Sequence, residues 1–466
     1  MTDTAIAGLI PRGSIGLKLL LVCLLVLLMA VPLTMVGIIM AGRQDRAHQV
    51  INEISARAGG QQTLGGPVLL VPYTRTVLSQ TPQGQRSDVI HGNYLILPTS
   101  GGAQANVDVT DRRRGIYRAA VYHADTRFHA EFDPAAAAAG INAADQLDWN
   151  SARVVVFAHD ARAMRATPTI ALAGGAPVEM AAAMDLSVLP ASINQASRYI
   201  PESDPALQVF AAPASLGAGP HPFSTDAHLD VTGAQRFAIA AFAQNTTVAM
   251  HGNRRDVSAT GYFQSVDPLQ PGAHGFDANW RAPLSANGGR AIDLEQLSLR
   301  QLADRDMAVS FVSSDDLYNG VARAISYGIL FIGLVFLATL IFEAVSGKKA
   351  HPAQYILVGL AQCVFYLLLL SMTEIIGFDG AFLMGAGATI VLLAYYAAAS
   401  ARSASVGAGA FVGLSGLYGA MYVLLTLEDY ALLAGSLVAF LAIAATMIAT
   451  RRIDWYGRTG SVSAAT

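Results

Sequence analysis

The stretch His351–Phe378, HPAQYILVGLAQCVFYLLLLSMTEIIGF, decides the fold class of this chain. Its middle, Tyr355–Thr373, contains no charged residue, and an apolar run of this length is what a helix needs to cross the hydrocarbon of a bilayer. Proline is well tolerated in the first turn of a helix, so His351-Pro352 predicts the helix start. Glu374 follows the run directly. The stretch therefore predicts a membrane-spanning helix that is polar at both ends.

The composition of the whole chain agrees with a membrane protein. Of the 466 residues, 53% are hydrophobic and only 14% are charged, whereas about 25% are charged in a typical soluble protein. The formal net charge of −3 gives no basic surface for nucleic acid, so we expect no nucleic-acid partner. Cys23 and Cys363 both lie in apolar runs, which predicts neither a disulfide framework nor a cysteine metal site.

Apolar runs predict one membrane span near the N-terminus and five near the C-terminus. The run Leu19–Gly42 is uncharged and longer than the roughly 7–15 residues of a signal-peptide core, so we favour an uncleaved anchor. The later candidate spans are Ala324–Phe342, Tyr355–Thr373, Gly380–Ser400, Val406–Leu427 and Tyr430–Thr450. We expect an integral membrane protein with an α-helical bundle of one plus five spans and a large β-rich (α+β) domain between spans 1 and 2.

The charges between the later spans predict the orientation of the chain. Basic and acidic loops alternate, and basic loops stay in the cytoplasm. Arg43, Arg46 and Arg57 argue the other way, but they precede a long translocated segment, where the rule has less force. Both termini are therefore expected in the cytoplasm, and the large domain in the periplasm of a Gram-negative cell. The expected parts are a cytoplasmic N-terminus (1–18), an anchor (19–42), a periplasmic β-rich domain (43–323), a five-helix domain (324–450) and a cytoplasmic tail (451–466).

Alternating patterns predict strands in the outer domain. In RFHAEFD (127–133), charged residues and histidine share one face, while Phe128, Ala130 and Phe132 share the other. We expect mostly antiparallel strands packed as a large sandwich or a twisted pair of sheets. The Ala-rich stretch Pro134–Gln146 predicts a helix or loop insertion, and Pro213–Asp226 predicts a long loop. The pattern is compatible with one domain or with two halves.

Motifs that carry chemistry are absent from the sequence. There is no phosphate-binding loop ending in Lys-Ser or Lys-Thr, and no HExxH pair of metal-binding histidines. His159-Asp160-Ala161-Arg162 predicts a loop turn held by Asp160 and Arg162 rather than an acid–base cluster. We expect no catalytic residue, no cofactor and no metal.

Polar and small residues near the membrane predict helix contacts. Gly409 and Gly413 have the spacing that lets helices approach closely, so we expect a dry contact there. Gln362 lies deep in its span and is expected to hydrogen-bond a neighbouring helix. Glu374 and Arg323 end consecutive spans on the same side of the membrane, which predicts an ion pair between them.

The stretch His351–Phe378 also resembles the CreD family of inner-membrane proteins. Further segments resemble that family in the same order along the chain, among them LGGPVLLVPY (64–73), GFDANW (275–280) and RRIDWY (451–456). The positions that carry the motif are Glu343, His351, Pro352, Gln354, Tyr355 and Asp454. The resemblance implies one N-terminal helix, then a periplasmic domain, then five C-terminal helices. It also implies an association with a two-component regulatory system and with responses to envelope damage. It implies no catalytic residue.

Two functions follow from these observations. The first is a non-enzymatic protein of the cell envelope, in the lipid bilayer, whose outer domain binds an unknown envelope protein or wall component; it rests on the absent catalytic motifs. The second is a transporter or lipid-handling protein that uses the C-terminal helices; it rests on Gln362 and the Gly-rich fifth span. We favour the first, and the oligomeric state is left open.

Overall fold

A computed structural model describes most of the chain. It covers residues 15–81, 84–183, 207–214, 216–217, 219–267, 270–272, 275–283, 291–293, 299–311, 315–346 and 351–426, with short pieces between 435 and 448. Asp454, and most of the span expected at Tyr430–Thr450, lie outside the described residues. The chain divides into a helical unit, Met1–Ala47 with Ser314–Thr466, and a β-rich unit, His48–Ser313.

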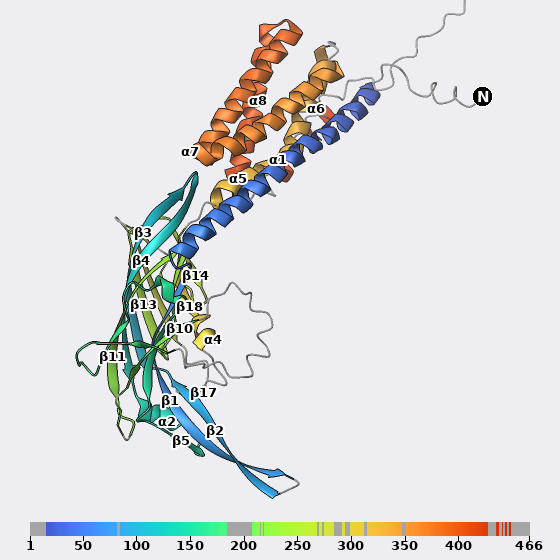
Figure 1. Ribbon diagram of the computed structural model, residues 1–466. Helices are drawn as coiled ribbons and strands as arrows, with labels where there is room; N and C mark the ends of the chain where they lie inside the picture. The colour runs from blue at the N-terminus through green and yellow to red at the C-terminus, as the bar shows by residue number, and fades with distance from the viewer. Residues whose placement is uncertain are drawn as a thin grey trace, which may run out of the picture. The chain divides into compact units, whose positions relative to one another are not determined.

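The helical unit consists of four long apolar helices and the short amphipathic helix α5 among the described residues (Figure 1). They are α1 (Ile15–Arg57, whose last turns belong to the β-rich unit), α5 (Asp315–Ser326), α6 (Gly328–Ser346), α7 (Pro352–Ala401) and α8 (Ala404–Thr426). Among the described residues, α1, α7 and α8 are each long and apolar enough to cross a membrane, and α5 with α6 forms a further candidate bent by 47°. The chain is therefore built to sit in a bilayer.

Helix α7 is a helical hairpin rather than one straight rod. Gln354 Nε2 donates a hydrogen bond to Ser400 Oγ over 2.8 Å, although 46 residues of straight helix would separate them by about 69 Å. The rings of Phe365 and Phe382 are 5.7 Å apart for the same reason. The reversal occurs at Gly377, whose φ of 78° and ψ of 170° suit a residue without Cβ. The two halves correspond to the separate spans predicted at Tyr355–Thr373 and Gly380–Ser400.

Aromatic rings and Gly359 form close helix contacts in the described part of the bundle. The ring of Phe365 lies 5.1 Å from that of Tyr418, which joins α7 to α8. A Cβ on Gly359 would collide with Met29 and Phe336, so the helices approach closely there. No described atom lies within 4 Å of a Cβ built at Gly409 or Gly413, and most of the expected sixth span lies outside the described residues, so the contact predicted there stays a prediction. Spacing alone does not say which face of a helix meets a neighbour.

The β-rich unit contains two large sheets that pack face to face. The first sheet has the order β14 (Val257–Gly261), β18 (Asp306–Phe311), β12 (Arg236–Ala240), β1 (Gln62–Thr81), β6 (Arg153–Ala158), β10 (Gln208–Pro213), β9 (Ala181–Ala182); β2 (Gly84–Ile96) and β5 (Asp145–Leu147) also pair with β1, and β17 (Ala291–Asp293) pairs with β2. The second has the order β15 (Gln270–Gly272), β16 (Gly275–Pro283), β13 (Asn245–Gly252), β3 (Ser100–Arg114), β4 (Tyr117–Phe132), β11 (Phe223–Ala234), β7 (Thr169–Leu172), β8 (Val178–Glu179). Short helices are α2 (Pro134–Ala138), η1 (Ala161–Ala163) and α4 (Leu299–Ala303).

A single core lies between the sheets. Phe128 of the second sheet packs edge-on against Phe242 at 5.5 Å, and Tyr122 packs against Phe237 of the first sheet at the same distance. The alternation predicted for β4 is present, since Phe128, Ala130 and Phe132 are buried. Pairing is antiparallel except between β1 and β12 and between β3 and β13. A sandwich is therefore the observed architecture.

The two predicted irregular segments are partly regular. Pro134–Gln146 begins with the helix α2, but its last two residues belong to β5. Pro213–Asp226 is not a loop throughout, because β11 begins at Phe223. Its pairing with β4, which is remote in sequence, extends the strand beyond what the local pattern indicates.

Candidate functional site

The residues of the opening motif build the start of α7. His351 is the N-cap: its Nδ1 accepts a hydrogen bond from the Ala353 amide at 3.2 Å. Gln354 Oε1 accepts from the His351 amide at 3.0 Å, which completes a capping box, and Pro352 occupies the first turn. The predicted helix start is confirmed, and the motif positions have a structural role there.

The next residue of the motif reaches a buried carboxylate. Tyr355 donates to Glu343 Oε2 at 3.2 Å, and Glu343 is also paired with Lys18 of α1. Only 7% of Glu343 is exposed. Burying a carboxylate costs free energy unless the group is paired. The contacts with Lys18 and Tyr355 offset this cost for Glu343 in the apolar bundle.

A second carboxylate, that of Glu374 in α7, also pairs with a cation of α1 and with a tyrosine hydroxyl. Glu374 Oε2 accepts from Arg43 Nη1 at 2.6 Å, and its Oε1 accepts from the hydroxyl of Tyr318 at 3.0 Å. The partner expected for Glu374 was Arg323, so that prediction is corrected to Arg43. The geometry explains why: five residues of helix turn the side chain by about 140°, so Arg323 projects from a different face of α5 than Tyr318.

The two ion pairs hold α1 at two depths. Lys18 and Arg43 are 25 residues apart, which is about 37 Å along a helix, and this exceeds the roughly 30 Å of bilayer hydrocarbon by a little at each end. We call Lys18–Glu343 the Lys18 clamp and Arg43–Glu374 the Arg43 clamp. Each clamp combines a cation of α1, a carboxylate and a tyrosine hydroxyl.

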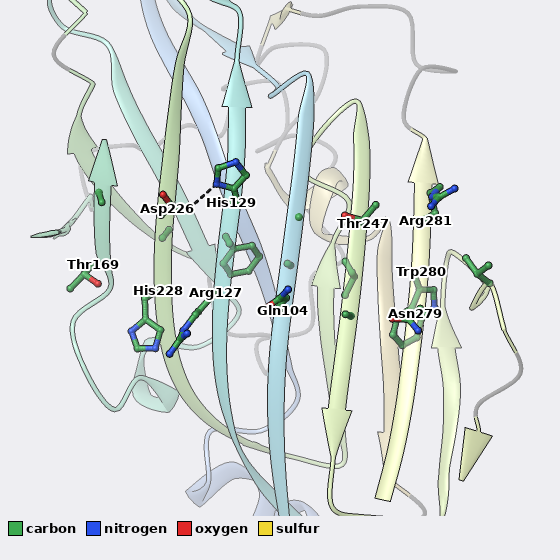
Figure 2. A pocket seen from close by; sticks show the side chains of 18 of the residues that line it. Gln104, Arg127, His129, Thr169, Asp226, His228, Thr247, Asn279, Trp280 and Arg281 are labelled. Atoms are coloured by element: carbon green, nitrogen blue, oxygen red, sulfur yellow. Dashed lines mark hydrogen bonds and ion pairs between the residues drawn. The ribbon is translucent and has the colours of Figure 1, made fainter. Parts of the chain in front are cut away.

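The β-rich unit carries a groove on the solvent face of its second sheet (Figure 2). Strand register places its lining in two rows that run across six strands. The first row is Thr169, His228, Arg127, Gln104, Ala249 and Asn279; the second row is Ala171, Asp226, His129, Gly102, Thr247 and Arg281. Val266 and Asp267 also line the groove.

The groove is long and narrow. Six strands at a spacing of about 4.8 Å make it about 24 Å long, and two rows on one face are about 7 Å apart along each strand. Its volume is about 720 Å³. Gly102, Ala171 and Ala249 form a low floor between longer side chains. The shape suits an extended chain better than a compact molecule.

Charges along the groove balance one another. Two arginines, Arg127 and Arg281, and two aspartates, Asp226 and Asp267, line the groove. His129 Nδ1 lies 2.8 Å from Asp226 Oδ1 (Figure 2). Arg127 is 77% exposed. The groove therefore offers donors and acceptors together, without an excess of either sign.

The adjoining row of the same face is a ladder of histidine–aspartate pairs. Its members in register are Asp230, Asp125, Asn106, His251 and Asp277. Asp125 lies directly opposite Asp230, and like charges in this position repel. Each is joined by a diagonal histidine, Asp230 by His123 at 2.6 Å and Asp125 by His228 at 3.3 Å, and His251 meets Asp277 at 2.5 Å. No group of three or more metal-binding side chains occurs in the described part of the chain.

The turn predicted at Asp160 is also present. Arg162 donates to Asp160 from its backbone amide at 2.9 Å and from its guanidinium at 2.7 Å. Burial alone raises the pKa of Asp160, but these hydrogen bonds outweigh it and leave the pKa below its ordinary value. The pair is a structural turn.

The motifs and the fold agree with the comparison to known proteins. The family model described as "Inner membrane protein CreD" matches residues 14–456. The chain belongs to the CreD family. Inner membrane protein CreD of Escherichia coli (strain K12) is 27% identical over 442 residues, which cover 92% of this chain and 91% of that protein. The resemblance noted in the sequence is confirmed, and the chain is an inner-membrane protein of this family.

The groove was not predicted as a site. Sequence alternation placed Arg127 and His129 on one exposed face, but it could not show that Gln104, Thr247 or Arg281 lie beside them. Gln104 and Arg281, on β3 and β16, are 177 positions apart in the chain, so only strand order brings such residues together.

Proposed function

We propose that this CreD-family chain is a non-enzymatic protein of the cell envelope that supports envelope integrity during cell-wall damage. Its sandwich stands in the periplasm and binds an envelope protein or wall component, and the helices anchor it in the inner membrane. The observation that carries the proposal is the two-row groove, a preformed concave surface with exposed polar groups.

We further propose six membrane spans with both termini in the cytoplasm. The hairpin of α7 supports counting it as two spans, because its ends meet through Gln354 and Ser400. Arg43 had argued against this orientation. Its pairing with Glu374 supplies a structural reason for a cation at that position, which weakens the objection.

A transporter or lipid-handling role is the second candidate. Gln362 favours it: the residue is 2% exposed, and its Nε2 has no hydrogen-bond partner among the described residues, contrary to the interhelical bond we expected. Against it, Phe365, Tyr366 and Leu369 are closely buried around the same part of α7. The carboxylates of Glu343 and Glu374 are already paired within the clamps, so they are not available to line a transport pathway.

The topology is tested with reporter fusions. Alkaline phosphatase is expected to be active after Asp133 or Asp379 and inactive after Ala401, because the reporter folds only outside the cytoplasm. A green fluorescent protein fused at the same sites is the reciprocal control and should be bright only after Ala401. The reverse pattern would overturn the proposed orientation.

Partner binding is tested by photo-crosslinking in living cells. A photoreactive amino acid at Gln104, at the centre of the groove, is expected to give an adduct that increases under β-lactam treatment. The same group at Arg118, on the β3–β4 hairpin and outside the groove, is the matched control and should give none. Equal labelling at both positions, or none at Gln104, would rule out the groove as the binding surface.

A further inference from the structure

We infer that the groove binds an extended, uncharged, polyhydroxylated chain, that is, a neutral oligosaccharide. This inference rests on the proposed function and narrows it to a class of ligand. The groove is about 24 Å long and about 7 Å between rows, which admits a linear chain along the row direction. The strands run across that direction, so a ligand would lie over the face of the sheet rather than extend its edge.

The groove chemistry favours hydroxyl groups. A hydroxyl both donates and accepts hydrogen bonds, and a carboxamide also does both. Gln104 and Asn279 supply carboxamides in the first row, and Thr247 supplies a hydroxyl in the second. Among the described residues, no side chain or backbone group forms a hydrogen bond with the carboxamide of Gln104 or Asn279. Arg281 and Asp226 add a pure donor and a pure acceptor. Such a mixture matches a ligand whose hydroxyl groups can each act as hydrogen-bond donor or acceptor.

The charges disfavour a polyion. The two arginines and two aspartates of the lining cancel, and the adjoining ladder adds Asp125, Asp230 and Asp277. A polyanion would meet these carboxylates along its whole length. A polycation would meet Arg127 and Arg281 within the groove, and each carboxylate of the ladder already contacts a histidine, so neither sign of charge is well complemented.

A peptide ligand is also disfavoured. Peptides are usually held through apolar pockets for side chains or through backbone pairing at a sheet edge. Phe128 and Trp280 border the groove from the same strands, but both side chains are buried toward the core, and the two exposed rows themselves contain no phenylalanine, tyrosine or tryptophan. Without such anchors, polar hydrogen bonds must carry both affinity and specificity, and we expect modest affinity.

The test measures binding to the full chain in nanodiscs by titration calorimetry. The probes share a four-ring β-1,4 backbone: neutral cellotetraose, its carboxylated form oxidised at C6, and the cationic glucosamine tetramer. A Gly/Ser peptide of similar length is the fourth probe. We expect cellotetraose to bind most tightly. Tighter binding of either charged sugar, or of the peptide, would overturn the inference, as would binding of none.

A pair of variants localises the binding. The double variant Gln104→Leu/Asn279→Leu is expected to weaken cellotetraose binding roughly 10-fold or more, because two hydrogen-bonding groups are lost. Asn106→Leu, two residues from Gln104 on the same face of β3 and outside the groove lining, is the matched control and should change binding less than about 2-fold. All three positions are exposed, and thermal melting confirms folding. Equal effects in both variants would refute binding in the groove.

The outcomes separate this inference from the proposed function. Crosslinked material from position 104 that is sensitive to protease but not to glycoside hydrolases would leave partner binding intact and overturn the neutral-sugar inference. Absence of any adduct would instead overturn the proposed function itself.

Discussion

Reversing either charge of the Arg43 clamp is expected to destabilise the helical unit strongly. Arg43→Glu places a second carboxylate beside Glu374, whose side chain is only 10% exposed, and Glu374→Arg places two cations together. Loss of a buried partner typically costs about 3 kcal/mol or more. The double exchange restores opposite charges and should recover most of the loss. Thermal unfolding in detergent or nanodiscs measures each variant.

Two controls make this result specific. Arg46 lies three residues further along α1, is exposed and makes no ion pair with any described residue, so Arg46→Glu should cost less than about 1 kcal/mol. Combining Arg323→Glu with Glu374→Arg should give no rescue, because the structure pairs Glu374 with Arg43. Silent single variants, or a double exchange no better than either, would remove the clamp as an explanation.

Asp145→Asn is expected to destabilise the sandwich at neutral pH by about 3 kcal/mol. Arg75, its cross-strand neighbour, donates to both carboxylate oxygens, at 2.5 Å and 2.7 Å, and Tyr94 donates at 2.6 Å. The carboxylate is fully buried. Asparagine keeps one acceptor oxygen but places an amide NH2 donor against the guanidinium. The short strand β5 therefore loses its side-chain attachment to Arg75 of β1.

The pH dependence of this effect follows from the pKa of Asp145. The hydrogen bond from Arg75 lowers that pKa below its ordinary value of 3.8, although burial opposes the change. A depressed pKa stabilises the folded state above the unfolded value, and the contribution is lost as pH falls through the folded value. The difference between the native chain and Asp145→Asn should therefore be constant from pH 5 to 7 and shrink below pH 3.8.

Tryptophan fluorescence during denaturation measures this difference, since Trp280 is buried in the sandwich. Asp88→Asn is the matched control: Asp88 pairs with Arg86 at 2.8 Å on β2, but both side chains are exposed. Such surface pairs contribute about 0–1 kcal/mol. An Asp145 effect that persists unchanged at pH 2 would show that charge is not its origin.

Local sequence patterns determined much of the architecture of this chain. Apolar runs predicted α1, the two halves of α7 and α8, because a membrane span depends on a continuous stretch of residues. His351-Pro352 predicted a helix start for the same reason, since a capping box joins residues only three positions apart. The alternation in β4 predicted which of its faces is buried.

Only the tertiary structure decided which distant residues meet. Glu374 pairs with Arg43 across 331 positions, and the side on which each helix packs depends on rotation about its axis. Five residues of α5 rotate Arg323 by about 140° away from Tyr318, and close packing at Gly359 depends on Met29 and Phe336 of other helices. The groove arises likewise from the register of β11, β4, β3, β13 and β16, which is set by long-range pairing and burial that no single strand encodes.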